Sequence, residues 1–335
     1  MGYGGGGSGG GGSGGGGSGG GGSAGGAIGG VGGTGAVVGR IKKFLGSRAI
    51  MAGGATPNRN TIDFWNIPVL SSALDFGDLS VGRQHLSGCS SGIRLVNFGG
   101  AASPDTSRID YNTFLTLGDA TDFGEMTGER ASGSNRMGSA PDGNRGVFMG
   151  GTSPTTGLSN IDYITIGTTV NSVEFSKMTA NRDGQAGCSD GVRGLTAGGN
   201  PPQNHVEFVN ISNLSDSVDW GEIPVAQIFA GNAGTSDGSR GVFVGGYGGG
   251  TDNRDNVQFV TIGTLGQAVD YGELFNGNYG ASNSSDGSRM CTAGGSEPTG
   301  YATTIQYHQI SQGGTALDFG EITQARGMAS HDSGG

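Results

Sequence analysis

One recurring stretch decides the fold of this 335-residue chain. Its third copy spans residues 145–151 and reads Arg-Gly-Val-Phe-Met-Gly-Gly. The Gly-Gly pair returns every 46 to 51 residues, and an arginine always stands five residues before its first glycine. The pairs lie at 53/54, 99/100, 150/151, 198/199, 245/246 and 294/295, and the arginines are Arg48, Arg94, Arg145, Arg193, Arg240 and Arg289. A period of this length indicates six copies of one repeat unit.

Two further landmarks follow each glycine pair. The second is an aliphatic residue, an acid or amide, and an aromatic residue, as in Ile62-Asp63-Phe64 and Val257-Gln258-Phe259. The third reads Asp-aromatic-Gly-acid, as in residues 75–78, and only the third copy departs from it, as Glu174-Phe175-Ser176-Lys177. Each unit therefore offers four short extended runs separated by turn residues. The 76 glycines of the chain also disfavour helices, because each glycine inside a helix costs about 1 kcal/mol relative to alanine.

Four strands in a repeat of this length are typical of a β-propeller blade, and kelch units are the nearest in length. We therefore predict an all-β, six-bladed, kelch-like β-propeller over residues 48–335, with four strands per blade. The approximate repeat units are 48–93, 94–144, 145–192, 193–239, 240–288 and 289–335. In each blade we name the strands a to d. Strand a is a run of Gly, Ala, Ser and Cys, strand b precedes the Gly-Gly pair, and strands c and d carry the second and third landmarks. The small residues of strand a predict that it is innermost.

The ends of the repeat array predict how the ring closes. A strand a precedes the arginine of the later copies but not Arg48, and a surplus strand a occurs at residues 328–332. The segment missing at one end is present at the other. We therefore predict that the C-terminal segment completes the first blade, which removes the open sheet edges.

The loop lengths distinguish the two faces of the predicted disc. Antiparallel neighbours place the a–b turns and c–d loops on one face, and the b–c and d–a connections on the other. From the second to the third landmark the spacing is 12 residues in all six units, whereas the b–c insert varies from 6 to 10 residues. We call these the fixed face and the variable face, and we predict that binding occurs on the variable face. The candidate binding residues are Asn58, Arg59, Asn204, Tyr247, Arg254 and Tyr301, types that suit sugar hydroxyls, a polar protein epitope or plain solvated loops.

Residues 1–47 form a separate Gly/Ser-rich arm. Residues 4–23 are four copies of Gly-Gly-Gly-Gly-Ser, a composition typical of a flexible tether. A laboratory linker and a natural low-complexity arm both fit this segment. Residues 36–46 are the first apolar cluster, which either docks the arm on the body or a partner or leads into the first strand. The candidate anchor residues are Ile41, Phe44 and Leu45.

The charged and metal-binding residue types argue against several classes of function. The net charge is −10 with only three lysines, which makes nucleic acid a poor partner. There is no run of 18 apolar residues for a membrane span. Cys89, Cys188 and Cys291 lack the spacing of a zinc site and are predicted to be buried thiols, and the four histidines form no recurring pair. We expect no cofactor, no metal and no enzymatic activity.

The six arginines admit two interpretations. They resemble the carboxylate-binding arginine set of a sialidase-like propeller. Most also follow a Ser-Asp-Gly-type turn, whose acid, such as Asp190 or Asp237, can form an ion pair or a hydrogen bond with the arginine. We favour this second, structural role, and we expect the turn acid also to cap its own backbone.

Three repeated phrases, at residues 145–151, 160–168 and 268–274, resemble the kelch-like repeat proteins encoded by marine bacteriophages. The resemblance covers residues 48–335 and not the arm. It implies a non-enzymatic virion structural protein, such as a tail fibre, another appendage or a capsid decoration, on the extracellular surface of the particle. Such a protein would bind other virion proteins through its arm, would meet a host-surface glycan or protein, and could form a homo-oligomer. The alternative is a secreted carbohydrate-binding lectin propeller.

Overall fold

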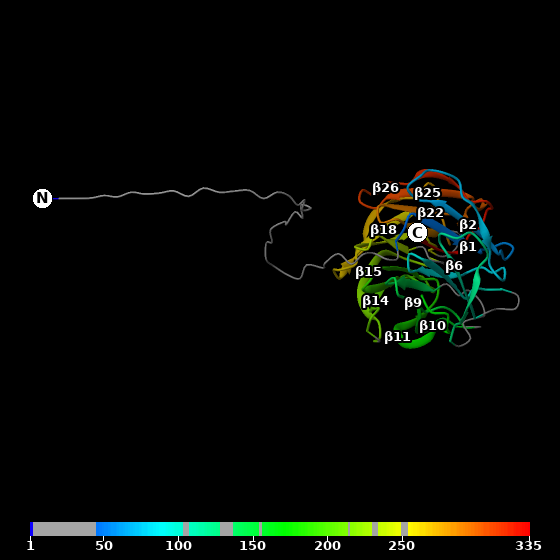
Figure 1. The fold of residues 1–335 in the computed structure, drawn as a ribbon, viewed down its shortest axis with the longest axis horizontal. Coiled ribbons are helices and arrows are strands. Elements are labelled where there is room, and N and C mark those ends of the chain that lie inside the picture. The colour runs from blue at the N-terminus through cyan, green and yellow to red at the C-terminus, as the bar shows by residue number, and fades with distance from the viewer. Residues whose placement is uncertain are drawn as a thin grey trace, which may run out of the picture. The chain divides into compact units, whose positions relative to one another are not determined.

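The computed structural model describes residues 1–2, 45–102, 107–127, 137–153, 156–213, 215–229, 234–248 and 254–335. It confirms the predicted fold, because six antiparallel sheets are arranged around a ring as a six-bladed β-propeller (Figure 1). No helix within these ranges is long and apolar enough to cross a membrane. The predicted anchor residues Ile41 and Phe44 lie outside the described residues.

Each blade has its strands in the order a, b, c, d. Blade 1 consists of β28 (Ser330–Gly334), β1 (Arg48–Ala52), β2 (Thr61–Asn66) and β3 (Leu74–Asp78); blade 2 of β4 (Ser87–Ser90), β5 (Arg94–Phe98), β6 (Arg108–Thr113) and β7 (Thr121–Glu125); blade 3 of β8 (Gly138–Pro141), β9 (Arg145–Met149), β10 (Leu158–Thr165) and β11 (Val173–Arg182). Blade 4 consists of β12 (Ala186–Ser189), β13 (Arg193–Ala197), β14 (Gln203–Asn210) and β15 (Val218–Gln227); blade 5 of β16 (Gly234–Ser236), β17 (Arg240–Val244), β18 (Asn256–Thr261) and β20 (Val269–Glu273); blade 6 of β21 (Ser282–Ser285), β22 (Arg289–Ala293), β25 (Thr304–Gln309) and β27 (Leu317–Glu321). The short strands β19 (Gly266–Gln267) and β26 (Gly314–Thr315) lie in c–d loops, and β23 (Ser296–Glu297) pairs with β24 (Gly300–Tyr301).

The two ends of the repeat array meet in blade 1. Strand β28 pairs antiparallel with β1 over five residue pairs, from Arg48 with Gly334 to Ala52 with Ser330. In Figure 1 the C-terminus accordingly lies beside β1. The predicted closure by the C-terminal strand is therefore confirmed, and the inner edge of β1 is occupied.

The small residues of strand a are explained by crowding at the ring axis. A Cβ atom added to Gly187 would lie 2.3 Å from the backbone nitrogen of Ser139 in the neighbouring blade. Cys89 and Cys188 also lie on strands a, whereas Cys291 lies on strand b of blade 6, and all three are buried and unpaired as predicted. Burial raises the pKa of each thiol, to about 12 for Cys291.

The apolar core is divided among the six interfaces between blades. Each of six clusters of buried side chains draws its members from two adjacent blades. Between blades 2 and 3, for example, the rings of Phe98 and Phe148 stack with their centroids 4.5 Å apart. Burial of apolar surface therefore stabilises the ring as a whole rather than each blade alone.

The c–d loop of each blade covers the outer edge of the blade before it. Its backbone donates a hydrogen bond to a carbonyl of the preceding strand d, as from Ala120 to Asp78 at 2.8 Å and from Ala268 to Glu222 at 2.8 Å. In blades 5 and 6 the contact becomes a parallel pairing, through β19 with β15 and β26 with β20. Every c–d loop thus pairs with the edge of the preceding blade. This pairing explains why the c–d spacing is 12 residues in every copy, because a longer loop would lose register with that edge.

The six repeated arginines connect consecutive blades. Each guanidinium donates to a backbone carbonyl at the end of the next blade's strand c, as from Arg289 to Ile67 at 2.8 Å and from Arg48 to Phe114 at 2.7 Å. Each also lies over the aromatic ring of its own blade's second landmark, 4.5 Å from the centroid for Arg289 over Tyr307. The expected guanidinium bond to a turn acid is not what the structure shows. The turn acid instead accepts from the backbone amide of the arginine, as Asp286 does from Arg289 at 2.7 Å.

We predict that deletion of residues 327–335 prevents the ring from closing. The deletion would leave β1 without its inner partner and would expose the core between blades 6 and 1, which contains Ala329. Loss of the folded state or aggregation is expected, measured by circular dichroism and light scattering. A variant that lacks only Gly335 serves as the control. A truncated chain that melts at the temperature of the full chain would contradict the closure mechanism.

Candidate binding site on the variable face

The structure places the six predicted loop residues in blades 1, 4, 5 and 6, and Tyr247 and Arg254 lie in the same b–c loop. Arg59 donates to the side-chain oxygen of Gln324, and Asn58 beside it is exposed. The Tyr247 ring lies 5.3 Å from that of Tyr279, and the Tyr301 hydroxyl lies 3.9 Å from the sulfur of Met328. Asn204 is half-buried within β14, and Arg254 lines a pocket that includes none of the other five.

Beneath the variable face, strand c of each blade buries a polar side chain at the same position of the repeat. These are the acids and amides of the second landmark, each at most 2% exposed: Asp63, Asp110, Asp162, Glu207, Gln258 and Gln306. In five blades this side chain accepts a hydrogen bond from the preceding blade. The donor there lies two residues after the end of that blade's third landmark. The Ser80 hydroxyl bonds to Asp110 at 3.1 Å, and the Phe275 amide bonds to Gln306 at 3.0 Å. Thr127, Thr179 and Thr323 do the same for Asp162, Glu207 and Asp63.

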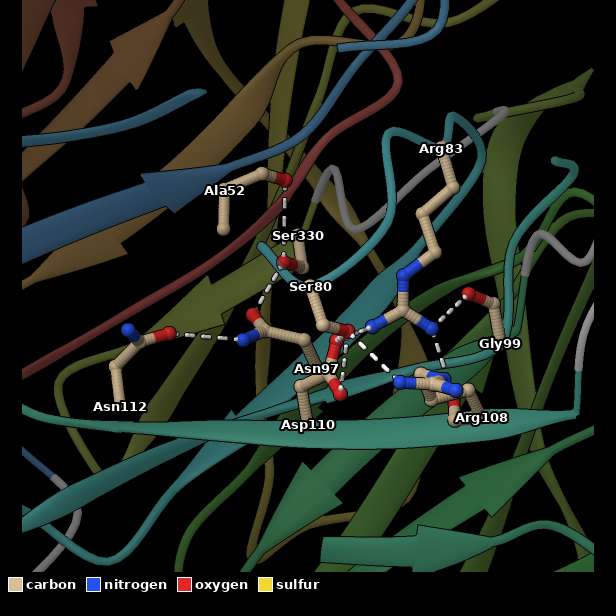
Figure 2. A network of polar contacts seen from close by, with 9 residues as sticks. All are labelled: Ala52, Ser80, Arg83, Asn97, Gly99, Arg108, Asp110, Asn112 and Ser330. Atoms are coloured by element: carbon tan, nitrogen blue, oxygen red, sulfur yellow. Dashed lines mark hydrogen bonds and ion pairs between the residues drawn. The ribbon is translucent and has the colours of Figure 1, made fainter. Parts of the chain in front are cut away.

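Three of the buried acids are also neutralised by a buried arginine of the preceding blade, which lies at the end of strand d or in the d–a connection. Figure 2 shows the network around Arg83, whose guanidinium bonds to Asp110 at 2.6 Å and to the carbonyls of Gly99 and Arg108 at 2.8 Å each. Arg182 pairs with Glu207 at 2.7 Å and Arg326 with Asp63 at 3.0 Å.

Burial dominates the electrostatics of these pairs. It lowers the pKa of Arg83 to about 10, so the guanidinium stays protonated at neutral pH. Burial also raises the pKa of Asp110, and the charge of Arg83 opposes that rise. The arrangement is a buried ion pair in which Nη1 of Arg83 also donates to two backbone carbonyls, while its Nε has no partner among the described residues.

The role of these arginines was not predicted, although the sequence contains a signal for it. For three of the four acids, namely Asp63, Asp110 and Glu207, the preceding blade supplies an arginine at the end of strand d or in the d–a connection. Where the landmark is an amide, the same position holds an amide, namely Gln227 before Gln258 and Asn278 before Gln306. The positions correspond because the backbone carbonyls of Arg182, Gln227 and Asn278 all accept from the second glycine of their own blade's Gly-Gly pair.

Two pockets lie at corresponding places on the variable face. One, of about 300 Å³, lies between blades 4 and 5 and is lined by Pro224, Val225, Arg254, Gln258, Asp270 and Glu273 among others. The other, of about 380 Å³, lies one blade earlier and contains Glu207, Asp219 and Glu222. Volumes of this size fit a small ligand.

The ring axis holds a much smaller cavity, of about 30 Å³, lined by residues of the a strands. Leu45, a predicted anchor residue, is half-buried at this cavity. The ring nitrogen Nε2 of His331 accepts from the Asn283 amide at 3.0 Å. The neighbouring Asp332 borders the same cavity, and burial raises its pKa to about 7 against the opposing hydrogen bonds from Ser333 and Ser90. A cavity of this size has room for one or two water molecules and not for a larger ligand.

Within the described ranges, no group of three or more His, Cys, Asp and Glu side chains is placed to hold a metal ion. A scan against models of known protein families gave no match, and a search of curated proteins found no significantly similar sequence.

We predict that Arg83 and Asp110 are strongly coupled. Arg83→Met leaves a buried carboxylate without its counter-charge, and Asp110→Asn leaves a buried guanidinium, so each is expected to lower the free energy of unfolding by roughly 3–5 kcal/mol. The double variant has no uncompensated charge and should be less destabilised than the sum of the singles by about 1–3 kcal/mol. Urea unfolding of the four proteins measures this coupling, and strictly additive losses would contradict it.

We predict a pH dependence of stability from Asp332. Its folded pKa of about 7 lies above the value of about 3.9 expected for the unfolded chain. The native state therefore binds the extra proton, and the stability it contributes is complete below about pH 4 and is lost as the pH rises through 7. Asp332→Asn should melt progressively higher than the natural chain between pH 5 and pH 8, measured by thermal unfolding. Asp122→Asn, at an exposed carboxylate, is the control, and an equal pH response of all three proteins would refute the assignment.

Proposed function

We propose that the chain is a non-enzymatic virion structural protein, a fibre, appendage or capsid decoration that displays its variable face toward the host surface. The observation that carries the proposal is that the chain enters β1 on the fixed face, opposite the loops that vary in length. Ser47, which leads into β1, accepts a hydrogen bond from Ile67 at the end of strand c, on the fixed face. A particle that holds the chain by the residues before Ser47 therefore leaves the variable face available to a partner.

The fixed face also exposes aliphatic side chains. Strand d begins with such a residue in five blades, and each is 50–63% exposed: Leu74, Val173, Val218, Val269 and Leu317. Ile93 and Leu115 on the same face are 68% and 71% exposed. Exposed apolar groups gathered on one face suit coverage by another protein. This supports the proposal that other virion proteins, or further copies of this chain, cover the fixed face.

The arm is assigned to attachment on sequence grounds. Ile41 and Phe44 would make apolar contacts with the rest of the particle, and the glycine-rich stretch would pass where side chains do not fit. The resemblance of the repeat phrases to those of bacteriophage kelch-like proteins supports a virion location.

A secreted carbohydrate-binding propeller is the second candidate function. The pocket between blades 4 and 5 favours it, because amide and carboxylate side chains line that pocket together. The two candidates differ in where the chain is found, since a virion protein purifies with particles and a secreted lectin is recovered from the medium.

We predict that the arm is required for incorporation into particles. A chain that begins at Gly46 should be lost from purified particles while it retains the melting temperature of the full chain. The measurement is immunodetection in gradient-purified particles, with Arg254→Ala in the full chain as a control that leaves attachment unchanged. Undiminished incorporation of the shortened chain would exclude the arm as the anchor.

A further inference from the structure

We infer that the pocket between blades 4 and 5 binds a neutral hexopyranose unit of a glycan. This inference deepens the proposed contact function of the variable face and rests on it. Three features of the described residues carry it, namely an interrupted hydrogen-bond pattern, a buried amide that faces the pocket, and the charge of the pocket.

The hydrogen-bond pattern is interrupted at Pro224. In the five other copies the corresponding residue donates through its hydroxyl or its amide to the buried polar side chain of the next blade, as Thr179 does to Glu207. Pro224 has neither a hydroxyl nor a backbone N–H and cannot donate. The side chain of Gln258 would accept a hydrogen bond from this position. It therefore lacks the donor that is present in the other five copies.

Gln258 is 1% exposed, and it lines the pocket. Among the described residues, neither its amide nitrogen nor its amide oxygen has a hydrogen-bond partner. Gln227, at the position where other blades place an arginine, is equally buried and also without partners in this part of the chain. An unsatisfied buried amide costs about 1–3 kcal/mol, which a ligand that pairs with it would recover.

The chemistry of the pocket selects the ligand. The Gln258 amide offers an acceptor oxygen and a donor NH2 group, which two adjacent hydroxyl groups of a sugar can pair with at once. Asp270 and Glu273 provide further acceptors for hydroxyl groups and Arg254 provides donors, while Pro224 and Val225 provide an apolar surface for the ring carbons. With Asp255, the pocket holds three carboxylates and one guanidinium, a net charge of −2. This charge disfavours uronic and sialic acids and leaves neutral pyranoses as the favoured class.

The corresponding pocket one blade earlier provides an internal comparison. There Glu207 accepts from the Thr179 amide at 3.2 Å and the Ser217 hydroxyl at 2.5 Å, and it pairs with Arg182 at 2.7 Å. The polar side chain at its base is satisfied by the protein itself. The difference between the two pockets therefore lies in the availability of the buried group and not in the shape of the repeat.

The test uses the full isolated chain and the methyl pyranosides of glucose, galactose and mannose, with methyl glucuronoside as the charged comparison. Saturation-transfer difference NMR reports binding, and titration gives the Kd. Pro224→Thr restores the donor found in other blades and should weaken binding at least tenfold without lowering the melting temperature. Asp270→Asn should also weaken binding, whereas Asp219→Asn, its counterpart in the comparison pocket, should not.

Binding of at least one neutral pyranoside that is lost in Pro224→Thr supports the inference. No binding of any neutral pyranoside by the folded chain overturns it, as does equal binding by the natural chain and Pro224→Thr, or a preference for the glucuronoside. These outcomes are independent of particle incorporation. Failure here with normal incorporation would leave the virion proposal standing, and sugar binding by a chain that is never incorporated would favour the secreted lectin.

Discussion

The pairing of β28 with β1 is the interaction on which the rest of the structure depends. Every blade relies on both neighbours, since its apolar side chains pack across blade interfaces and its outer edge is covered by the next blade's c–d loop. A ring with one gap would lose both kinds of support at the gap. Closure by a strand from the far end of the array gives every blade a neighbour on both sides, and it joins the first and last repeats across a long sequence separation.

A second constraint comes from burying a polar side chain at the same place in every blade. Because the backbone geometry is repeated, every blade buries a polar side chain at this position. The groups that form hydrogen bonds or ion pairs with it come from the preceding blade and differ from blade to blade. The pairs used are arginine with an acid, a threonine hydroxyl with an acid, and a backbone N–H with a glutamine side chain. Pro224 marks the one junction at which the donor common to the other copies is absent, and it is there that a buried amide faces a pocket.

The architecture was predictable from the sequence because the evidence for it is periodic. The glycine pairs, the arginines and the constant c–d spacing repeat at one interval, and the missing strand at one end matches the surplus strand at the other. The partner of each arginine was not predictable by the same reasoning, since the nearest acid in sequence, such as Asp286 for Arg289, binds only the backbone. The guanidinium instead donates to a carbonyl of the next blade, as Arg289 does to Ile67. Only the structure shows that this carbonyl lies within reach of the arginine. The candidate loop residues were chosen by type, and residue type does not show which loops converge. Pro224 was visible in the sequence, but its meaning depends on a donor pattern that only the structure reveals.

The division of each polar pair between consecutive repeats has a consequence for how such a ring changes over generations. Arg83 and Asp110 belong to different repeat units, and so do Arg182 and Glu207. A unit that is duplicated or transplanted carries one half of a pair on each side, so it is compatible only with a predecessor that supplies the matching half. Placed after Gln227, a unit with an acid would bury a charge opposite an amide. The six units therefore have an order of succession, and blades can be gained, lost or exchanged by recombination only where the chemistry at both new junctions agrees.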